Sequence, residues 1–286
     1  MSTATQLTDR VTYHGEGPFW DPVAGRLLLV DMLAGAIVEL DAEQQPIRHE
    51  YGGIAAVIRR RRAGGFVLAV EHGFRILDDD LSPVGDVQEV FADPAIRMNE
   101  GGCDPQGRLY LGTMAYDATE GAGTLYRIDA DRSVHEVLAG VTISNGLQWR
   151  ADGRAVFYND TPTHRISRFD FDPASGTFGE RTTVVEIPED SGNPDGLAID
   201  VEGGLWSAFY GGSCVRRYDQ DGRLTEVVDV PVRDVTSCTF GGPDGTTLFI
   251  TTSREGKGED HAEPGAGAVF TYEAGVAGAE QYRYAG

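Results

Sequence analysis

Basic residues are scarce in this sequence of 286 residues, which has 24 Lys and Arg against 45 Asp and Glu and a net charge of −21. Such an acidic chain is a poor partner for nucleic acid or an anionic membrane, and we expect it to bind neither. No apolar run reaches the ~18 residues of a membrane-spanning helix. The first residues, MSTATQLTDR, lack the basic head and apolar core of a signal peptide. These absences predict a soluble, cytoplasmic protein.

Cysteine is also sparse. Cys103, Cys214 and Cys238 are widely spaced and form no CxxC pair, so we predict that they are reduced and buried rather than part of a zinc or redox site. The sequence contains no GxSxG nucleophile elbow, no GxxxxGK[ST] phosphate-binding loop and no GxGxxG between a strand and a helix. These absences argue against α/β serine hydrolases, P-loop nucleotidases and dinucleotide-dependent dehydrogenases.

Glycine, in contrast, is abundant: its 38 residues favour many tight turns and few long helices. Six segments share a polar turn that ends in glycine and leads into a strand-like run: DPVAGRLLLVD from residue 21, RRAGGFVLAVE from 61, DPQGRLYLGTM from 104, ADGRAVFYND from 151, DVEGGLWSAFY from 200 and GPDGTTLFITT from 242. Their turn glycines are Gly25, Gly64, Gly107, Gly153, Gly203 and Gly245, with a mean spacing of 44 residues. The chain is therefore built from six repeats.

A second series of strand-like runs follows in step, each ending near an acidic residue and a turn, as AIVELD does at Asp41 and TLYRID does at Asp129. Apolar and polar residues alternate in these runs, which is typical of half-buried strands. Four short strands in a repeat of this length form the blade of a β-propeller. We therefore predict an all-β, six-bladed β-propeller formed by residues 1–286 as a single domain. The N-terminal TQLTDRVTY is expected to pair into the last blade and close the ring.

Polar residues recur at one position of the predicted inner strands. Eight residues before the turn glycine stand Ala56, Asn99, Asn145, Asp195 and Ser237, and Glu16 takes the matching place in the first repeat, whose turn is one residue longer. Three of these residues, Glu16, Asn145 and Asp195, directly precede a glycine. Asn or Asp before glycine also fits an ordinary turn, but Glu does not.

Carboxylates gathered around a narrow axis are costly to bury unless a cation or hydrogen bonds compensate them. We predict that Glu16, Asn145 and Asp195 hold one divalent metal ion. An all-oxygen site of this kind suits Ca²⁺, Mg²⁺ or Mn²⁺, and Zn²⁺ is kept as a further candidate. Three protein ligands leave positions open for water and substrate, as in catalytic metal sites.

The segments GEGPFW, RMNEGGCDPQGR, GTMAYD, ISNGLQW, PDGLAID and TSCTFGG, in this order and across nearly the whole chain, resemble the family of senescence marker protein (regucalcin), gluconolactonase and luciferin-regenerating enzyme. The resemblance implies a six-bladed propeller with one divalent metal in its channel and hydrolysis of sugar lactones. It places Glu16, Asn145 and Asp195 on the metal ligands, and Arg97, Asn99 and Asp117 on substrate-contacting residues. Asp117 stands where the family has Glu, and Glu100 where it has Asp.

Three functions remain open on this basis. The first is a metal-dependent lactonase that opens aldonolactones to aldonic acids, with Asp195 as the base that accepts a proton from water and with Arg97, Asn99 and Asp117 on the sugar hydroxyls. The second is a non-catalytic calcium- or ligand-binding propeller. The third is an esterase or phosphotriesterase that uses the same metal. We expect a small-molecule partner and a monomer or small homo-oligomer.

Other polar and aromatic residues are interpreted as structural. His14, two residues before Glu16, is expected to be a strand-edge histidine with a surface neighbour rather than a ligand or base. Glu71 and His72 have no third ligand at a matching spacing. Trp20, Trp149 and Trp206 recur near blade positions and are expected in the core.

Overall fold

The six turn glycines all adopt the left-handed conformation that the turns require. Their φ angles lie between 65° and 93°, a region in which any residue with a Cβ is strained. Each of these turns joins the innermost strand of a sheet to its neighbour, so the repeat seen in the sequence is the repeat of the fold.

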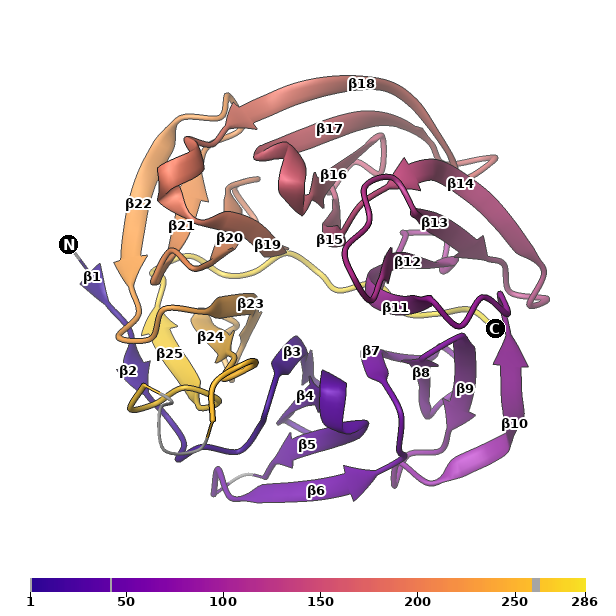
Figure 1. Cartoon of the computed structure of the whole chain (residues 1–286), viewed down its shortest axis with the longest axis horizontal. Coiled ribbons are helices and arrows are strands. Elements are labelled where there is room, and N and C mark those ends of the chain that lie inside the picture. The colour runs from indigo at the N-terminus through magenta and orange to yellow at the C-terminus, as the bar shows by residue number, and fades with distance from the viewer. Residues whose placement is uncertain (1, 42, 259–262) are drawn as a thin grey trace.

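The structure is a computed structural model that describes residues 2–41, 43–258 and 263–286. It confirms the six-bladed β-propeller: six sheets surround a central axis, with their first strands innermost (Figure 1). Strands account for 56% of the chain and helices for 3%. The helices in the described ranges are three single 3₁₀ turns: η1 (Met32–Ala34), η2 (Thr161–Thr163) and η3 (Glu189–Ser191). Among the described residues, none of the helices has the length and apolar character that a bilayer crossing requires.

The first three blades each contain four antiparallel strands in chain order. Blade 1 contains β3 (Gly15–Asp21), β4 (Arg26–Asp31), β5 (Ala36–Leu40) and β6 (Pro46–Glu50). Blade 2 contains β7 (Ala55–Arg60), β8 (Phe66–Val70), β9 (Gly73–Leu77) and β10 (Pro83–Glu89). Blade 3 contains β11 (Ile96–Cys103), β12 (Leu109–Ala115), β13 (Gly123–Ile128) and β14 (Val134–Val141).

The last three blades follow the same plan, with additions from the N-terminus. Blade 4 contains β15 (Ser144–Trp149), β16 (Ala155–Asp160), β17 (Arg165–Asp172) and β18 (Thr177–Glu186). Blade 5 contains β19 (Asn193–Ile199), β20 (Leu205–Tyr210), β21 (Cys214–Tyr218), β22 (Leu224–Asp229) and, at its outer edge, β1 (Ser2–Thr3). Blade 6 contains β23 (Val235–Gly241), β24 (Thr247–Thr252), β25 (Val269–Glu273) and β2 (Thr5–Gln6).

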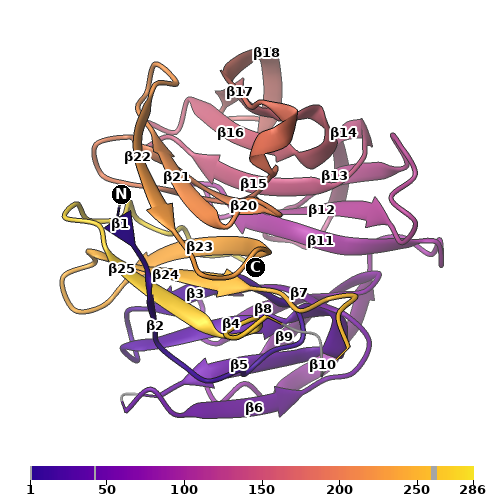
Figure 2. The same ribbon diagram turned by 60° about the vertical axis from the view of Figure 1, so that its left-hand side comes forward.

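The N-terminal segment closes the ring, as predicted, and it does so on two blades. β2 pairs antiparallel with β25, with Thr5 opposite Thr271. β1, which precedes β2 in the chain, pairs in parallel with β22 of blade 5, with Ser2 opposite Val228 (Figure 2). The first residues of the chain therefore cover the outer edges of blades 5 and 6, which would otherwise expose unpaired backbone groups.

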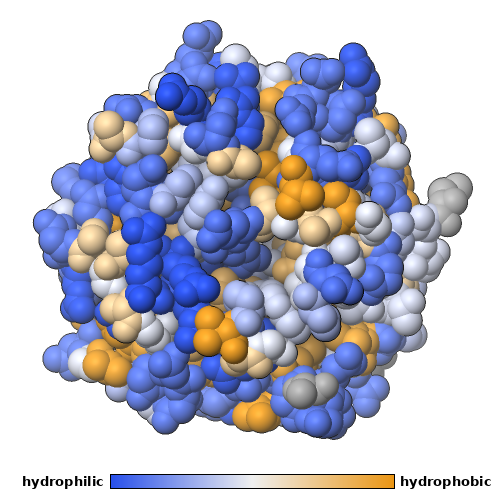
Figure 3. All heavy atoms as spheres, turned by 180° about the vertical axis from the view of Figure 1, so that it is seen from behind, coloured by the Kyte–Doolittle hydropathy of each residue, from blue (hydrophilic) through white to orange (hydrophobic). Residues whose placement is uncertain are grey.

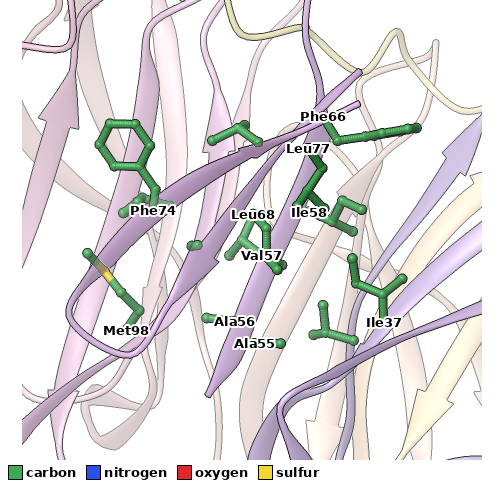
Figure 4. Close-up of a cluster of buried hydrophobic side chains, with 14 of the residues drawn as sticks. Ile37, Ala55, Ala56, Val57, Ile58, Phe66, Leu68, Phe74, Leu77 and Met98 are labelled. Carbon is green, nitrogen blue, oxygen red and sulfur yellow. The ribbon is translucent and has the colours of Figure 1, made fainter. Parts of the chain in front are cut away.

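The cores of the blades are apolar and continuous between neighbours. The largest cluster joins blades 1, 2 and 3 and includes Ile37, Ile58, Phe74 and Met98 (Figure 4). Trp149 and Trp206 are buried as expected, whereas Trp20 is partly exposed and stacks on Phe249. The three cysteines are free and buried, which confirms their predicted state.

The C-terminal segment crosses the far end of the ring, behind the inner strands in Figure 1. It forms single bridges between Gly278 and Asp200 and between Tyr284 and Arg61, so it ties blade 5 to blade 2. Figure 3 shows this opposite face, where hydrophilic side chains predominate and apolar ones lie in scattered patches.

Candidate active site

A β-bulge interrupts every inner strand at the position of the polar residues picked out in the sequence. The strand register shifts between Glu16 and Phe19, between Asn145 and Gln148, and around Asp195. The other three inner strands shift around Ala56 and Asn99 and next to Ser237. Bulges re-aim side chains near binding sites. In two of them Gly17 and Gly146 have φ angles of 47° and 44°, so the glycine after Glu16 and after Asn145 allows the backbone to turn.

Four of these bulges, at Glu16, Asn99, Asn145 and Asp195, contribute to the lining of a cavity of about 410 Å³. Five of the six residues predicted from the sequence line it: Glu16, Arg97, Asn99, Asn145 and Asp195. All five side chains are buried, with residue exposures of 4–8%. Residues that the sequence did not single out line the same cavity: Met114, Ile143, Thr161, Pro162, His164, Asn193, Tyr210 and Glu255. Blades 1, 3, 4 and 5 thus contribute the predicted residues to one cavity.

A chain of hydrogen bonds links the cavity residues of blades 3 and 4. Arg97 Nη1 donates to Asn99 Oδ1 at 2.7 Å. Asn99 Nδ2 donates to Asn145 Oδ1 at 3.0 Å and to the carbonyl of Ser144 at 2.9 Å. Asn145 Nδ2 donates to Thr161 Oγ1 at 2.8 Å. Both amide protons of Asn99 are therefore used within the protein, so this residue holds its neighbours in place.

Two carboxyl groups at the cavity, those of Glu16 and Asp195, have shifted pKa values. Burial raises the pKa of Glu16 from 4.5 to about 8, with Glu100 adding to the rise and the bond from the Gly17 N–H opposing it. Burial, and then the charge of Glu16, raises the pKa of Asp195 well above 3.8. The charge of Arg97 lowers both pKa values, but none of the described Lys, Arg and His nitrogens forms an ion pair with either carboxylate.

This environment fits a divalent cation. A positive ion between Glu16 and Asp195 would remove the cost of two buried negative charges, and the free lone pair of Asn145 Oδ1 completes a hard oxygen donor set. The described ranges contain no cluster of three or more His, Cys, Asp or Glu side chains placed to ligate one ion. A cation here would depend on the Asn145 amide oxygen and on water or substrate for its other ligands.

Comparisons with known proteins place the chain in a family. Residues 14–254 match the family model described as the SMP-30/Gluconolactonase/LRE-like region. The chain belongs to this family. It is 32% identical to pentonolactonase XacC of Haloferax volcanii, and the alignment covers 98% of both chains. It is 33% identical to regucalcin of Xenopus laevis, and this alignment covers 90% of this chain and 89% of the regucalcin chain. A solved structure of a calcium-binding protein, regucalcin, from Agrobacterium tumefaciens superposes with a TM-score of 0.89 at 28% identity and 99% coverage of both chains.

In this SMP-30/gluconolactonase-like chain, His14 directly precedes β3 and bridges to Ser253. It is buried, at 7% exposure, and lines the cavity beside Glu16. Its Nδ1 lies 2.8 Å from Ser253 Oγ and 3.3 Å from Glu255 Oε2. Burial and the charge of Arg97 lower its pKa from 6.5 to about 3, so the ring is neutral. His14 is thus a histidine at the edge of a strand with a partly exposed neighbour, Glu255, as expected, and residues 253–255, far along the chain, contribute to its burial.

Asp117 is the one predicted site residue of this family member that does not line the cavity. It is exposed in the turn after β12, and Thr119 donates both its backbone N–H and its hydroxyl to the Asp117 carboxylate, which lowers the pKa of Asp117. Its neighbour Tyr116 lies nearer the site, with the Arg97 guanidinium 5.9 Å from its ring centroid. The Tyr116 hydroxyl donates to Glu71, which gives that carboxylate the structural role expected of it.

Proposed function

We propose that the protein is a divalent-metal-dependent lactonase that hydrolyses sugar lactones to aldonic acids. One observation carries the proposal: two buried carboxylates with no ion-pair partner among the described residues line one cavity together with an arginine, Arg97, whose Nη1 alone is used in hydrogen bonds to described residues. Family membership and a relative named pentonolactonase support it. Polar side chains around the cavity favour a polyhydroxylated substrate over an apolar ester.

In this proposal Glu16, Asn145 and Asp195 hold the ion through their side-chain oxygens. When bound, a divalent cation polarises the lactone carbonyl and stabilises the negative charge that develops on it. Glu16 and Asp195 are then kept ionised, which the raised pKa values of both groups would otherwise oppose.

Asp195 serves as the base. A water molecule attacks the lactone carbonyl carbon, and its proton passes to a carboxylate oxygen of Asp195. As the bond between the carbonyl carbon and the ring oxygen breaks, Asp195 returns this proton to the ring oxygen. The product is the open hydroxy acid, and the carboxylate of Asp195 is restored.

Arg97 orients the substrate. Its Nη1 is committed to Asn99 and to the Met98 carbonyl, whereas its Nε and Nη2 make no hydrogen bond to any described residue. These donors are available to ring hydroxyls or to the lactone oxygen. A buried guanidinium left unpaired by a wrong substrate is costly, so this contact favours lactones with a hydroxyl in reach.

Acid release from a panel of pentono- and hexonolactones, measured with wild-type protein, tests the proposal. Activity should disappear in EDTA and return when Ca²⁺, Mn²⁺, Mg²⁺ or Zn²⁺ is added. The second candidate is a non-catalytic calcium-binding propeller, which the calcium-binding relative favours. Metal binding without acid release from any lactone of the panel would support that alternative and overturn the lactonase.

A further inference from the structure

Thr161 has a single proton to donate, and its surroundings decide where that proton goes. Its Oγ1 lies 2.8 Å from the carbonyl oxygen of Pro194, which can only accept. The Thr161 hydroxyl therefore donates to Pro194. The same oxygen then has only lone pairs to offer to Asn145, whose Nδ2 lies 2.8 Å away.

The opposite end of this series of hydrogen bonds, at Arg97, is just as constrained. Arg97 can only donate, so the atom of Asn99 that it contacts is the oxygen. The Asn99 amide nitrogen then donates to the Ser144 carbonyl and to the atom of Asn145 that faces it, which must be an oxygen. The two ends independently require the same orientation of Asn145: nitrogen toward Thr161 and oxygen toward Asn99.

We propose that Thr161 is a positioning residue that fixes which end of the Asn145 amide faces the cavity, and so presents an oxygen rather than an NH₂ group to the divalent cation. The inference rests on the metal site of the proposed function but not on lactone hydrolysis. A flipped amide would direct an NH₂ group toward the cation, and it would set this group against the donating Nδ2 of Asn99.

Replacing Thr161 by Val keeps the shape and removes the hydroxyl that accepts from Asn145. Groups that orient a metal ligand typically change metal affinity by about 10- to 100-fold, and we expect a loss in this range for Thr161→Val. Thr161→Ser keeps the hydroxyl and should bind within about threefold of wild type. Thr113→Val is the matched control: Thr113 is buried and its hydroxyl also donates to a carbonyl and accepts from an N–H, but both partners belong to Thr124.

The readout is the dissociation constant for Ca²⁺ and for Mn²⁺ alone, measured by isothermal titration calorimetry on EDTA-stripped full-length protein. Because no lactone is present, a direct contact of Thr161 with substrate cannot produce the effect. Thermal unfolding in EDTA checks that each variant folds, and Thr161→Ala tests the same bond if the valine variant does not fold.

Asn145→Asp provides a second test, because a carboxylate has an oxygen at either end. In this background Thr161→Val should change the dissociation constant by less than about threefold. Wild-type affinity in Thr161→Val, or an equal loss in the Asn145→Asp background, would overturn the inference while leaving the lactonase proposal intact. If the Thr161 variants show the expected losses of metal affinity but the wild-type protein opens no lactone, only the proposed function is overturned. A wild type that binds neither ion would overturn the inference.

Discussion

Stripping the divalent metal should make the folded state lose stability as the pH rises above neutrality. The carboxyl of Glu16 has a pKa of about 8 in the native protein and 4.5 as its ordinary value. The native state thus keeps this proton where the unfolded chain has lost it, and the stabilisation present below pH 4.5 declines until about pH 8. Asp195 acts in the same direction.

His14 opposes this trend at lower pH. Its pKa falls from 6.5 to about 3 on folding, so between these values the unfolded chain binds the proton and stability rises with pH. Only above pH 6.5 does Glu16 act without this opposition. At about 1.4 kcal/mol for each pH unit, the interval from pH 6.5 to 8 corresponds to a loss of about 2 kcal/mol in the free energy of unfolding.

Urea unfolding in EDTA, followed by tryptophan fluorescence at pH 6.5, 7.5, 8.5 and 9, measures this loss. Glu16→Gln should flatten the decline, whereas Glu43→Gln, which changes an exposed carboxylate, should keep the wild-type slope. Saturating Ca²⁺ should reduce the slope because the ion favours the ionised carboxylates. A metal-free wild type with constant stability over this range, or an unchanged slope in Glu16→Gln, would refute the argument.

Three further outcomes are expected. Asp195→Asn should lower kcat at saturating metal by about 10²- to 10⁴-fold; a plateau within threefold of wild type would remove the base. Arg97→Ala should lower kcat/KM for polyhydroxylated lactones more than for an unsubstituted lactone, and the difference should correspond to a loss of about 1–3 kcal/mol in transition-state stabilisation. Asp117→Ala should have less effect because Asp117 lies outside the cavity lining. Equal losses for both variants would contradict this. Deleting residues 2–6 should lower Tm by several degrees in thermal unfolding, since β1 and β2 complete two blades; an unchanged Tm would argue against their closing role.

The fold was predictable from the sequence because its signal is local and repeated. A turn that demands a positive φ leaves a glycine at the same place in each repeat, and six such places define six blades. The register of the polar residues was predictable for the same reason. Counting back from each turn reaches the bulge of each inner strand, so Glu16, Asn145 and Asp195 were found without any knowledge of contacts.

The surroundings of the site were not predictable in this way, because they depend on contacts between distant segments. The burial of His14 is one example, because nothing near it in sequence reveals its contacts with Ser253 and Glu255. Thr161 follows a strand as an ordinary 3₁₀ residue, and its role depends on the carbonyl of Pro194 in the next blade. Asp117 shows the opposite case: its motif position suggested the cavity, whereas its carboxylate accepts from Thr119 in an exposed turn outside the cavity lining.

Ring closure and the site are physically linked. Glu16 lies in blade 1, whereas Asn145 and Asp195 lie in blades 4 and 5, so the proposed ligands approach the cavity from opposite parts of the ring. Blade 1 follows directly from the N-terminal segment that completes blades 5 and 6. The backbone of His14, next to blade 1, also bridges to Ser253 beyond β24. The position of Glu16 relative to Asp195 therefore depends on pairing between the two ends of the chain, and a bound cation would in turn oppose opening of the ring at this joint.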